Sequence, residues 1–132
     1  MGAWSGEPFG NDVAADWAWD LEEADDWTLV RTALEDAITP DAVDERTAVI
    51  ALAAAEVVAH GLGRPTQDDA YTGELSAFVS RASAPSDEIV ALAIAAVERA
   101  SDPDGDLALT WEECGNEAWL EAVHLLARAL DA

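Results

Sequence analysis

The chain has 132 residues, with 28 Asp or Glu, six Arg and no Lys, so its formal net charge is −22. Six dispersed Arg cannot form a dominant basic face, which excludes ordinary recognition of the nucleic-acid backbone and attraction to anionic membranes. A hydrophobic content of 51% excludes a disordered acidic tail. The length is that of one acidic domain, residues 1–132, able to bury a core.

No segment predicts export or a membrane span. The N-terminus lacks the basic region and the long apolar run of a secretory signal. The longest uninterrupted apolar run, residues 48–55, is far shorter than the roughly 20 residues that cross a bilayer. We therefore expect a cytoplasmic protein.

Capping residues and apolar spacing predict two helices in the first third of the chain. Residues 1–10 are rich in Gly and aromatic side chains and are expected to form an ordered loop. Asn11 or Asp12 can cap a first helix that runs to about residue 24. Asp25 or Asp26 can cap a second helix, which ends at Pro40. Its inner face is predicted from the spacing of Trp27, Val30, Leu34 and Ile38.

The third predicted helix covers about residues 44–60. Acidic residues open it, and Gly61 is expected at its C-terminal end in the left-handed position. Residues 48–59 are apolar on every side of the helix except at Glu56. A helix that is apolar all round is normally buried, so this one is expected at the centre of the fold.

The second half of the chain predicts four further helices. They span about residues 72–81, 87–101, 107–114 and 117–130, and Ser86 is the expected cap of the second. No segment shows the alternation of a strand. The sequence therefore predicts an all-α single-domain bundle of about six to seven short helices. An alternative is a short helical-hairpin array of the HEAT or armadillo kind, because VIALAAAEV (49–57) and IVALAIAAV (89–97) are similar at an offset of 40 residues.

The opening segment carries the most distinctive motif, G-x-W-x4-F-x-N-D-x-A-x-D-W, which runs from Gly2 to Trp17. Together with Leu21, the run AAEVVA at 54–59 and Pro85-Ser86-Asp87, this motif resembles an uncharacterised bacterial family, domain of unknown function 4259. The resemblance covers most of the chain. It implies a single bacterial domain and assigns no catalytic residue.

The first predicted helix carries a candidate interaction surface. Trp17 and Trp19 are two residues apart and cannot share one helix face, so we expect Trp19 to be the exposed one. Acids recur at i, i+4, i+8 and i+11, at Asp12, Asp16, Asp20 and Glu23. Such a stripe could receive a basic partner or divalent cations, or it could simply be a solvated face.

Glu56 is the most anomalous residue, because its apolar surroundings predict that it is buried. A buried carboxylate must be paired, hydrogen-bonded or protonated, and His60 lies one turn further on the same face. The pair could act as a general base or as metal ligands. Alternatively, Glu56 is a structural acid bound to an Arg, a Trp N–H or the backbone amides of the N-terminal loop.

Two spacings point weakly to metals. Asp102, Asp104, Asp106 and Glu113 match positions 1, 3, 5 and 12 of a calcium loop, but Leu107 stands where such loops have Gly. Glu121 and His124 form one E-x-x-H, and a di-iron bundle needs a second one, which this chain lacks. We therefore expect no cofactor, with calcium at residues 102–113 as the alternative.

The sequence thus leads to two hypotheses about function. The first is a non-enzymatic acidic protein of the inhibitor, immunity or adaptor type that binds a basic protein partner. The second is a metal-binding protein or hydrolase that uses Glu56 and His60 or the acidic loop at 102–113.

Overall fold

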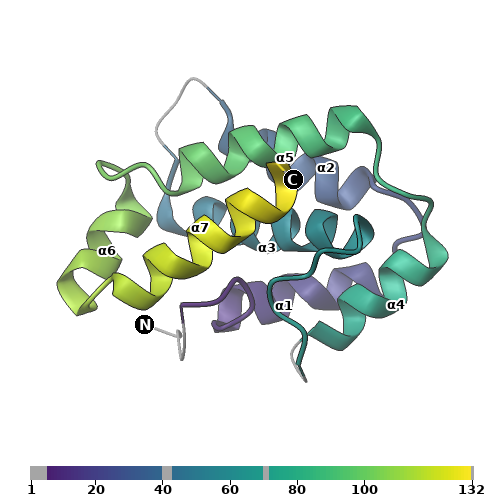
Figure 1. Ribbon diagram of the computed structural model, residues 1–132, viewed down its shortest axis with the longest axis horizontal. Coiled ribbons are helices and arrows are strands. Elements are labelled where there is room, and N and C mark those ends of the chain that lie inside the picture. The colour runs from purple at the N-terminus through teal and green to yellow at the C-terminus, as the bar shows by residue number, and fades with distance from the viewer. Residues whose placement is uncertain (1–5, 40–42, 70–71, 132) are drawn as a thin grey trace.

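The computed structural model describes residues 6–39, 43–69 and 72–131. Within these residues the chain forms helices and no strand, in agreement with the predicted all-α fold (Figure 1). The seven helices are α1 (Asp12–Leu21), α2 (Thr28–Ala37), α3 (Glu45–Gly61), α4 (Gly73–Arg81), α5 (Asp87–Ala100), α6 (Asp106–Cys114) and α7 (Glu117–Asp131).

Helix α3 is the centre of the molecule. It packs against each of the other six helices, most extensively against α5 and α2. Every side chain from Ala51 to His60 is buried, which is the expected consequence of a helix that is apolar all round. In Figure 1, α5 lies above α3, α7 crosses in front of it, and α1 and α4 lie below.

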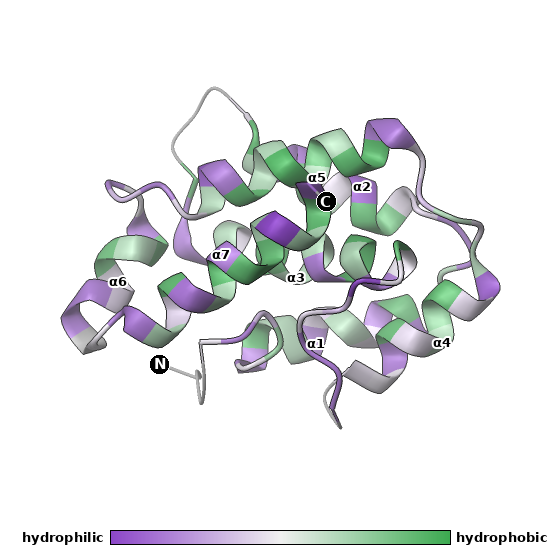
Figure 2. Cartoon of the chain, in the orientation of Figure 1, coloured by the Kyte–Doolittle hydropathy of each residue, from purple (hydrophilic) through white to green (hydrophobic). Residues whose placement is uncertain are grey.

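This arrangement is a bundle around a central helix rather than a hairpin array. In an array of helical repeats each unit contacts only its neighbours, whereas α3 contacts helices from both ends of the chain. The similar apolar runs of α3 and α5 reflect their shared place in the core. Figure 2 shows the middle of α5 mostly green, with purple segments at its ends, as expected of a helix that buries its centre.

The predicted helix starts are confirmed where a side chain caps the helix. Asn11, Asp44 and Ser86 each accept a hydrogen bond from the backbone N–H three residues further on. These bonds satisfy amides that the first turn of a helix leaves unpaired. Helices α2 and α6 are different, because Trp27 and Gly105 occupy their cap positions and no side chain caps them. The predicted cap of α2 at Asp25 or Asp26 is therefore wrong.

The predicted ends of α1 and α3 are wrong. Helix α1 stops at Leu21 instead of residue 24, and the guanidinium of Arg81 donates to the backbone carbonyls of Leu21 (2.6 Å) and Ala24 (2.9 Å) at that end. Helix α3 includes Gly61, and the left-handed residue that ends it is Gly63, with φ of +75°. Only glycine adopts that conformation without strain.

Trp27 joins four segments of the fold. Its ring packs edge-on against Phe78 of α4, with centroids 5.0 Å apart, and its Nε1 donates to the carbonyl of Ser83 (2.7 Å). Trp27, Val30 and Leu34 are buried as predicted. Ile38 is 36% exposed, because α2 ends at Ala37 and Ile38 follows the last turn. Trp4 and Pro40 lie outside the described residues.

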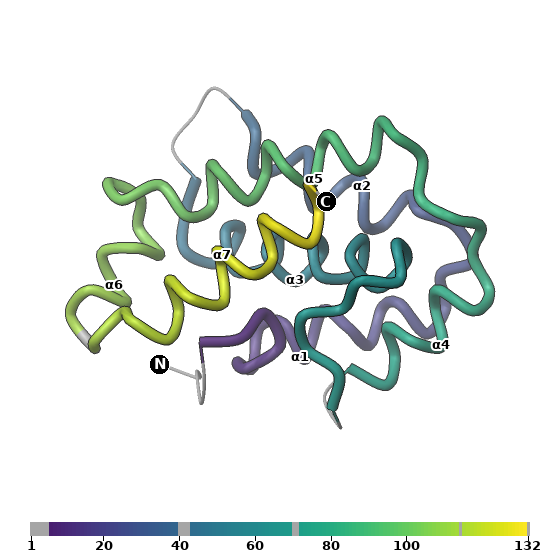
Figure 3. The backbone as a smooth tube through the Cα atoms, in the orientation of Figure 1, coloured from purple at the N-terminus to yellow at the C-terminus, as the bar shows by residue number. Residues whose placement is uncertain are grey.

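A connector, residues 62–72, leads from α3 to α4 and is described at 62–69 and 72. Figure 3 shows it descending from the end of α3 past α1 to the start of α4. In the described part of the chain, no helix combines the length and the apolar character needed to span a bilayer.

Candidate functional site

The outward side of α1 carries one exposed aromatic side chain among carboxylates. We define the acidic face of α1 as Asp12, Asp16, Trp19, Asp20 and Glu23. Helix α1 buries Ala14, Trp17, Ala18 and Leu21 on its opposite side. Trp19 is 61% exposed, as predicted, whereas Trp17 is 8% exposed. Asp12, Asp16 and Trp19 follow an i, i+4, i+7 pattern, so they lie in one row that points away from the core.

The carboxylates of this face have no basic partner among the described residues. The ion pairs of Arg31 and Arg81 involve Glu35, Glu88 and Asp25, none of which belongs to the face. Like charges at i and i+4 repel by a few tenths of a kcal/mol per pair. Glu23 lies beyond the end of α1, in the turn that follows it. The acidic face therefore presents uncompensated negative charge around an indole ring.

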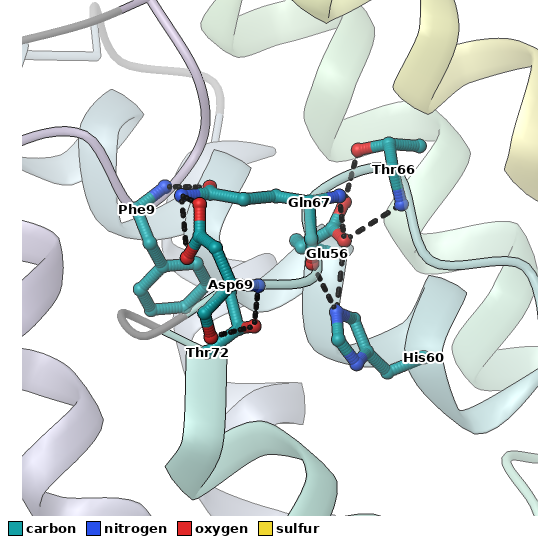
Figure 4. A network of polar contacts seen from close by, with 7 residues as sticks. All are labelled: Phe9, Glu56, His60, Thr66, Gln67, Asp69 and Thr72. Carbon is teal, nitrogen blue, oxygen red and sulfur yellow. Dashed lines mark hydrogen bonds and ion pairs between the residues drawn. The ribbon is translucent and has the colours of Figure 1, made fainter.

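Glu56 is fully buried and both of its carboxylate oxygens are satisfied (Figure 4). Oε2 accepts from the backbone N–H groups of Thr66 (2.9 Å) and Gln67 (3.0 Å), and Oε1 accepts from the Thr66 hydroxyl (2.5 Å). His60 Nε2 lies 3.0 Å from Oε2. The burial of Glu56 was predicted, but its partners are the connector and His60 rather than the N-terminal loop.

Gln67 extends this network to the N-terminal segment. Its carbonyl lies 2.8 Å from His60 Nε2, and its side-chain oxygen accepts from the backbone N–H of Phe9 (2.8 Å). Its amide nitrogen donates to Asp69 (3.2 Å), whose backbone N–H donates to the Thr72 hydroxyl (3.0 Å). The network thus fastens α3, the connector and the segment before α1 together.

His60 carries a proton on Nε2, because that atom faces a carbonyl oxygen that can only accept. Burial lowers the pKa of His60 and is the largest single influence. The hydrogen bond to Glu56, the carbonyl of Gln67 and the charges of Glu56 and Asp68 act together in the opposite direction. Their sum holds the pKa of His60 above its usual value of 6.5.

Glu56, His60 and the connector residues Thr66 and Gln67 form a structural contact, the polar joint, rather than an acid–base site. The side chains of Glu56 and His60 are 0% and 4% exposed, respectively. Neither residue lines either of the two pockets described below. A general base needs a free lone pair within reach of a substrate proton, and here the hydrogen bonds of the connector occupy the carboxylate.

Two concave regions of the described residues differ in size and lining. The first lies among the N-terminal segment, α3, α6 and α7, beside the stacked rings of Trp111 and Trp119, whose centroids are 6.3 Å apart. Its volume of about 20 Å³ accommodates roughly one water molecule. The second is an open groove of about 350 Å³ lined by Glu22, Gly73, Glu74, Ala77 and Arg81. The guanidinium of Arg81 already binds two carbonyls there.

The structure does not bring the candidate calcium ligands together. Asp106 and Glu113 both lie in α6, seven residues apart, which corresponds to roughly 10 Å along a helix axis. Asp102 instead accepts from the backbone N–H of Asp104 (2.9 Å) in a local turn. Across the described ranges, no group of three or more His, Cys, Asp or Glu side chains could hold a metal ion. Glu121 and His124 are exposed on α7.

The fold and its surface define a small acidic all-α domain with a sealed polar joint and an exposed acidic face on α1. Residues 2–122 match the family described as Domain of unknown function (DUF4259), and the chain belongs to that family. Neither a curated protein nor a solved structure matches the chain.

Proposed function

We propose that this protein is a cytoplasmic bacterial interaction protein of the inhibitor, immunity or adaptor type. It binds a basic protein partner through the acidic face of α1. The observation that carries the proposal is the exposed indole of Trp19 in a row of carboxylates that lack internal partners. Trp is enriched among the residues that dominate binding energy at protein interfaces, and complementary charge accelerates and orients association.

The alternative hypothesis of a hydrolase or metal protein has less support. Its best residue, Glu56, is satisfied by the connector and is separated from the pockets. The acidic face of α1 is more suitable for recognition than for chemistry, because its side chains are exposed and point outward.

The test compares two variants of equal charge. Asp12→Asn/Asp16→Asn/Asp20→Asn removes three charges from the acidic face of α1. Glu112→Gln/Glu113→Gln/Glu121→Gln removes three exposed charges from α6 and α7 (Figure 1). Tagged wild type and both variants are used to capture partners from a lysate of the organism that encodes the protein. We expect one stoichiometric basic protein to be captured by wild type and by the α6–α7 variant, and lost with the α1 variant.

The salt dependence of the association provides the second criterion. For a basic partner, the on-rate measured by stopped-flow should fall steeply as ionic strength rises. A partner that associates at a salt-independent rate, or that the two variants capture equally well, would contradict the proposal.

A further inference from the structure

Trp19 is the large aromatic side chain of the described residues that the fold leaves most exposed. Trp17, Trp27 and Trp119 are 8%, 9% and 3% exposed, whereas Trp19 is 61% exposed. Its position on the outward side of α1 means that packing among the described residues does not account for it. The neighbouring charge and the ring itself indicate which chemical group would cover it.

The chain contains a precedent for that group. Arg81 places its guanidinium carbon 6.0 Å from the ring centroid of Phe78, and its Nε lies 3.8 Å from a carboxylate oxygen of Asp25. An aromatic face and a carboxylate together thus receive one guanidinium. The acidic face of α1 offers the same two components around Trp19, with Asp16 three residues before it and Glu23 four residues after it. Asp16, three residues before Trp19, is its neighbour on the surface of α1, and Glu23 lies in the turn that follows the helix.

A guanidinium suits this surface better than an ammonium does. It is planar and weakly hydrated, so it can stack on an indole while its edge donates to carboxylates. A lysine ammonium is compact and strongly hydrated, and it pairs with carboxylates mainly as a point charge. An aromatic ring between acids therefore selects arginine, whereas acids alone select only positive charge.

We propose that the partner docks by placing an arginine side chain flat on the indole of Trp19, with its guanidinium edge bound by the carboxylate of Asp16. This inference rests on the proposed function and adds the identity of the recognised group. The occupant is a basic protein segment that presents arginine, and lysine at the same position binds more weakly.

Two dye-labelled peptides of equal length and charge provide the test, one alternating Arg with Gly and the other alternating Lys with Gly. Their affinities for the full chain are measured by fluorescence anisotropy at low salt. We expect the arginine peptide to bind about two- to fivefold more tightly, the range of a cation–π contact at an exposed site. Trp19→Ala should abolish this difference and leave the affinity for the lysine peptide within about twofold.

Leu125→Ala is the matched control, because Leu125 is also an exposed apolar residue (43%) but lies on α7. It should preserve the preference for arginine. Circular dichroism of Trp19→Ala checks that the variant is still helical. We expect it to fold like wild type, because Trp19 is exposed. An arginine preference that survives Trp19→Ala would overturn the inference.

The same peptides separate the two proposals. If both bind alike, and Asp12→Asn/Asp16→Asn/Asp20→Asn weakens both more than the α6–α7 variant does, arginine selection is refuted and the basic-partner proposal stands. If the two charge variants weaken peptide binding equally, the acidic face of α1 is not the binding site, and both proposals are refuted.

Discussion

Glu56 holds the connector through acceptor atoms alone, and all of its partners are donors. The backbone amides of Thr66 and Gln67 would remain buried and poorly paired if that charge were removed. A hydrogen bond to an ionised group contributes about 1.5–3 kcal/mol to the stability of a fold. The residue is therefore more important for folding than its position in an Ala-rich helix suggests.

We predict that Glu56→Gln lowers the free energy of unfolding by about 1.5–3 kcal/mol, because the amide replaces a charged acceptor and directs a donor at other donors. Urea unfolding followed by circular dichroism measures the change. Glu98→Gln, at an exposed position on α5, is the control and should stay within about 0.5 kcal/mol of wild type. A Glu56→Gln protein as stable as this control would show that the joint contributes nothing to folding.

His60 makes stability depend on pH in a defined direction. Its folded pKa is raised above 6.5, so the charged form is favoured in the native state. That contribution is fully present below the unfolded pKa of about 6.5 and is lost as pH rises through the folded pKa. We predict that the stability difference between wild type and His60→Gln shrinks as pH rises above about 6.5.

Urea unfolding of both proteins across this pH range measures the effect. His124→Gln is the matched control, because His124 is the other histidine of the chain and is exposed on α7. It should leave the pH dependence of wild type unchanged. A wild-type advantage over His60→Gln that grows with pH would contradict the sign of the pKa shift.

The sequence predicted the burial of Glu56 but not the residues that bind its carboxylate. A single acid in an all-round apolar helix must be buried, and that argument is local. Thr66 and Gln67 follow the turn at Gly63, and the path of a connector after a turn depends on what it packs against. The one sequence signal was the pair of polar residues directly after Arg64-Pro65.

Helix α3 meets α2 and α5 at Gly61, where the chain has no room for a side chain. A Cβ on Gly61 would lie 2.9 Å from the ring of Trp27 and 3.0 Å from Pro85. The ring cannot easily withdraw, because its Nε1 donates to the carbonyl of Ser83 and the ring packs against Phe78. The close packing of Trp27 and Pro85 against α3 therefore depends on the absence of a side chain at Gly61.

We predict that Gly61→Ala destabilises the fold by about 1–3 kcal/mol, the usual penalty of overpacking. Gly73→Ala provides the contrast, because nothing lies within 4 Å of the added Cβ at the start of α4. That variant should be unchanged or slightly more stable. Thermal and urea unfolding distinguish the two, and equal stability would show that Trp27 moves aside at no cost.

The helix starts that a side chain caps were predicted correctly, whereas the ends of α1 and α3 were not, for a physical reason. Caps such as Asp44 and Ser86 act on amides three residues away, so the signal is local. The carbonyls at the end of α1 are instead bound by Arg81, about 60 residues later in the chain, and a local pattern does not reveal such a contact. The exposure of Trp19 followed from helix periodicity alone, because Trp17 occupies the core side of α1.

The whole molecule carries a net charge of −22, and its self-repulsion opposes the compact state. We predict that the unfolding midpoint rises with sodium chloride, and that most of the rise occurs below about 0.2 M, where the Debye length falls from roughly 30 Å to 8 Å. Thermal scans at graded salt measure this. Potassium chloride is the control and should act identically. A rise confined to molar salt would indicate preferential exclusion of salt rather than screening.

The central position of α3 has a consequence for local opening. Because α3 contacts all six other helices, it stays covered by five of them when any one of them opens. Its amides from Ala51 to Ala59 should therefore exchange with deuterium only when the entire chain unfolds. The amides of α1 and α4, at the lower edge of Figure 1, should exchange through smaller openings. Exchange at α3 would then report the global unfolding equilibrium without any denaturant.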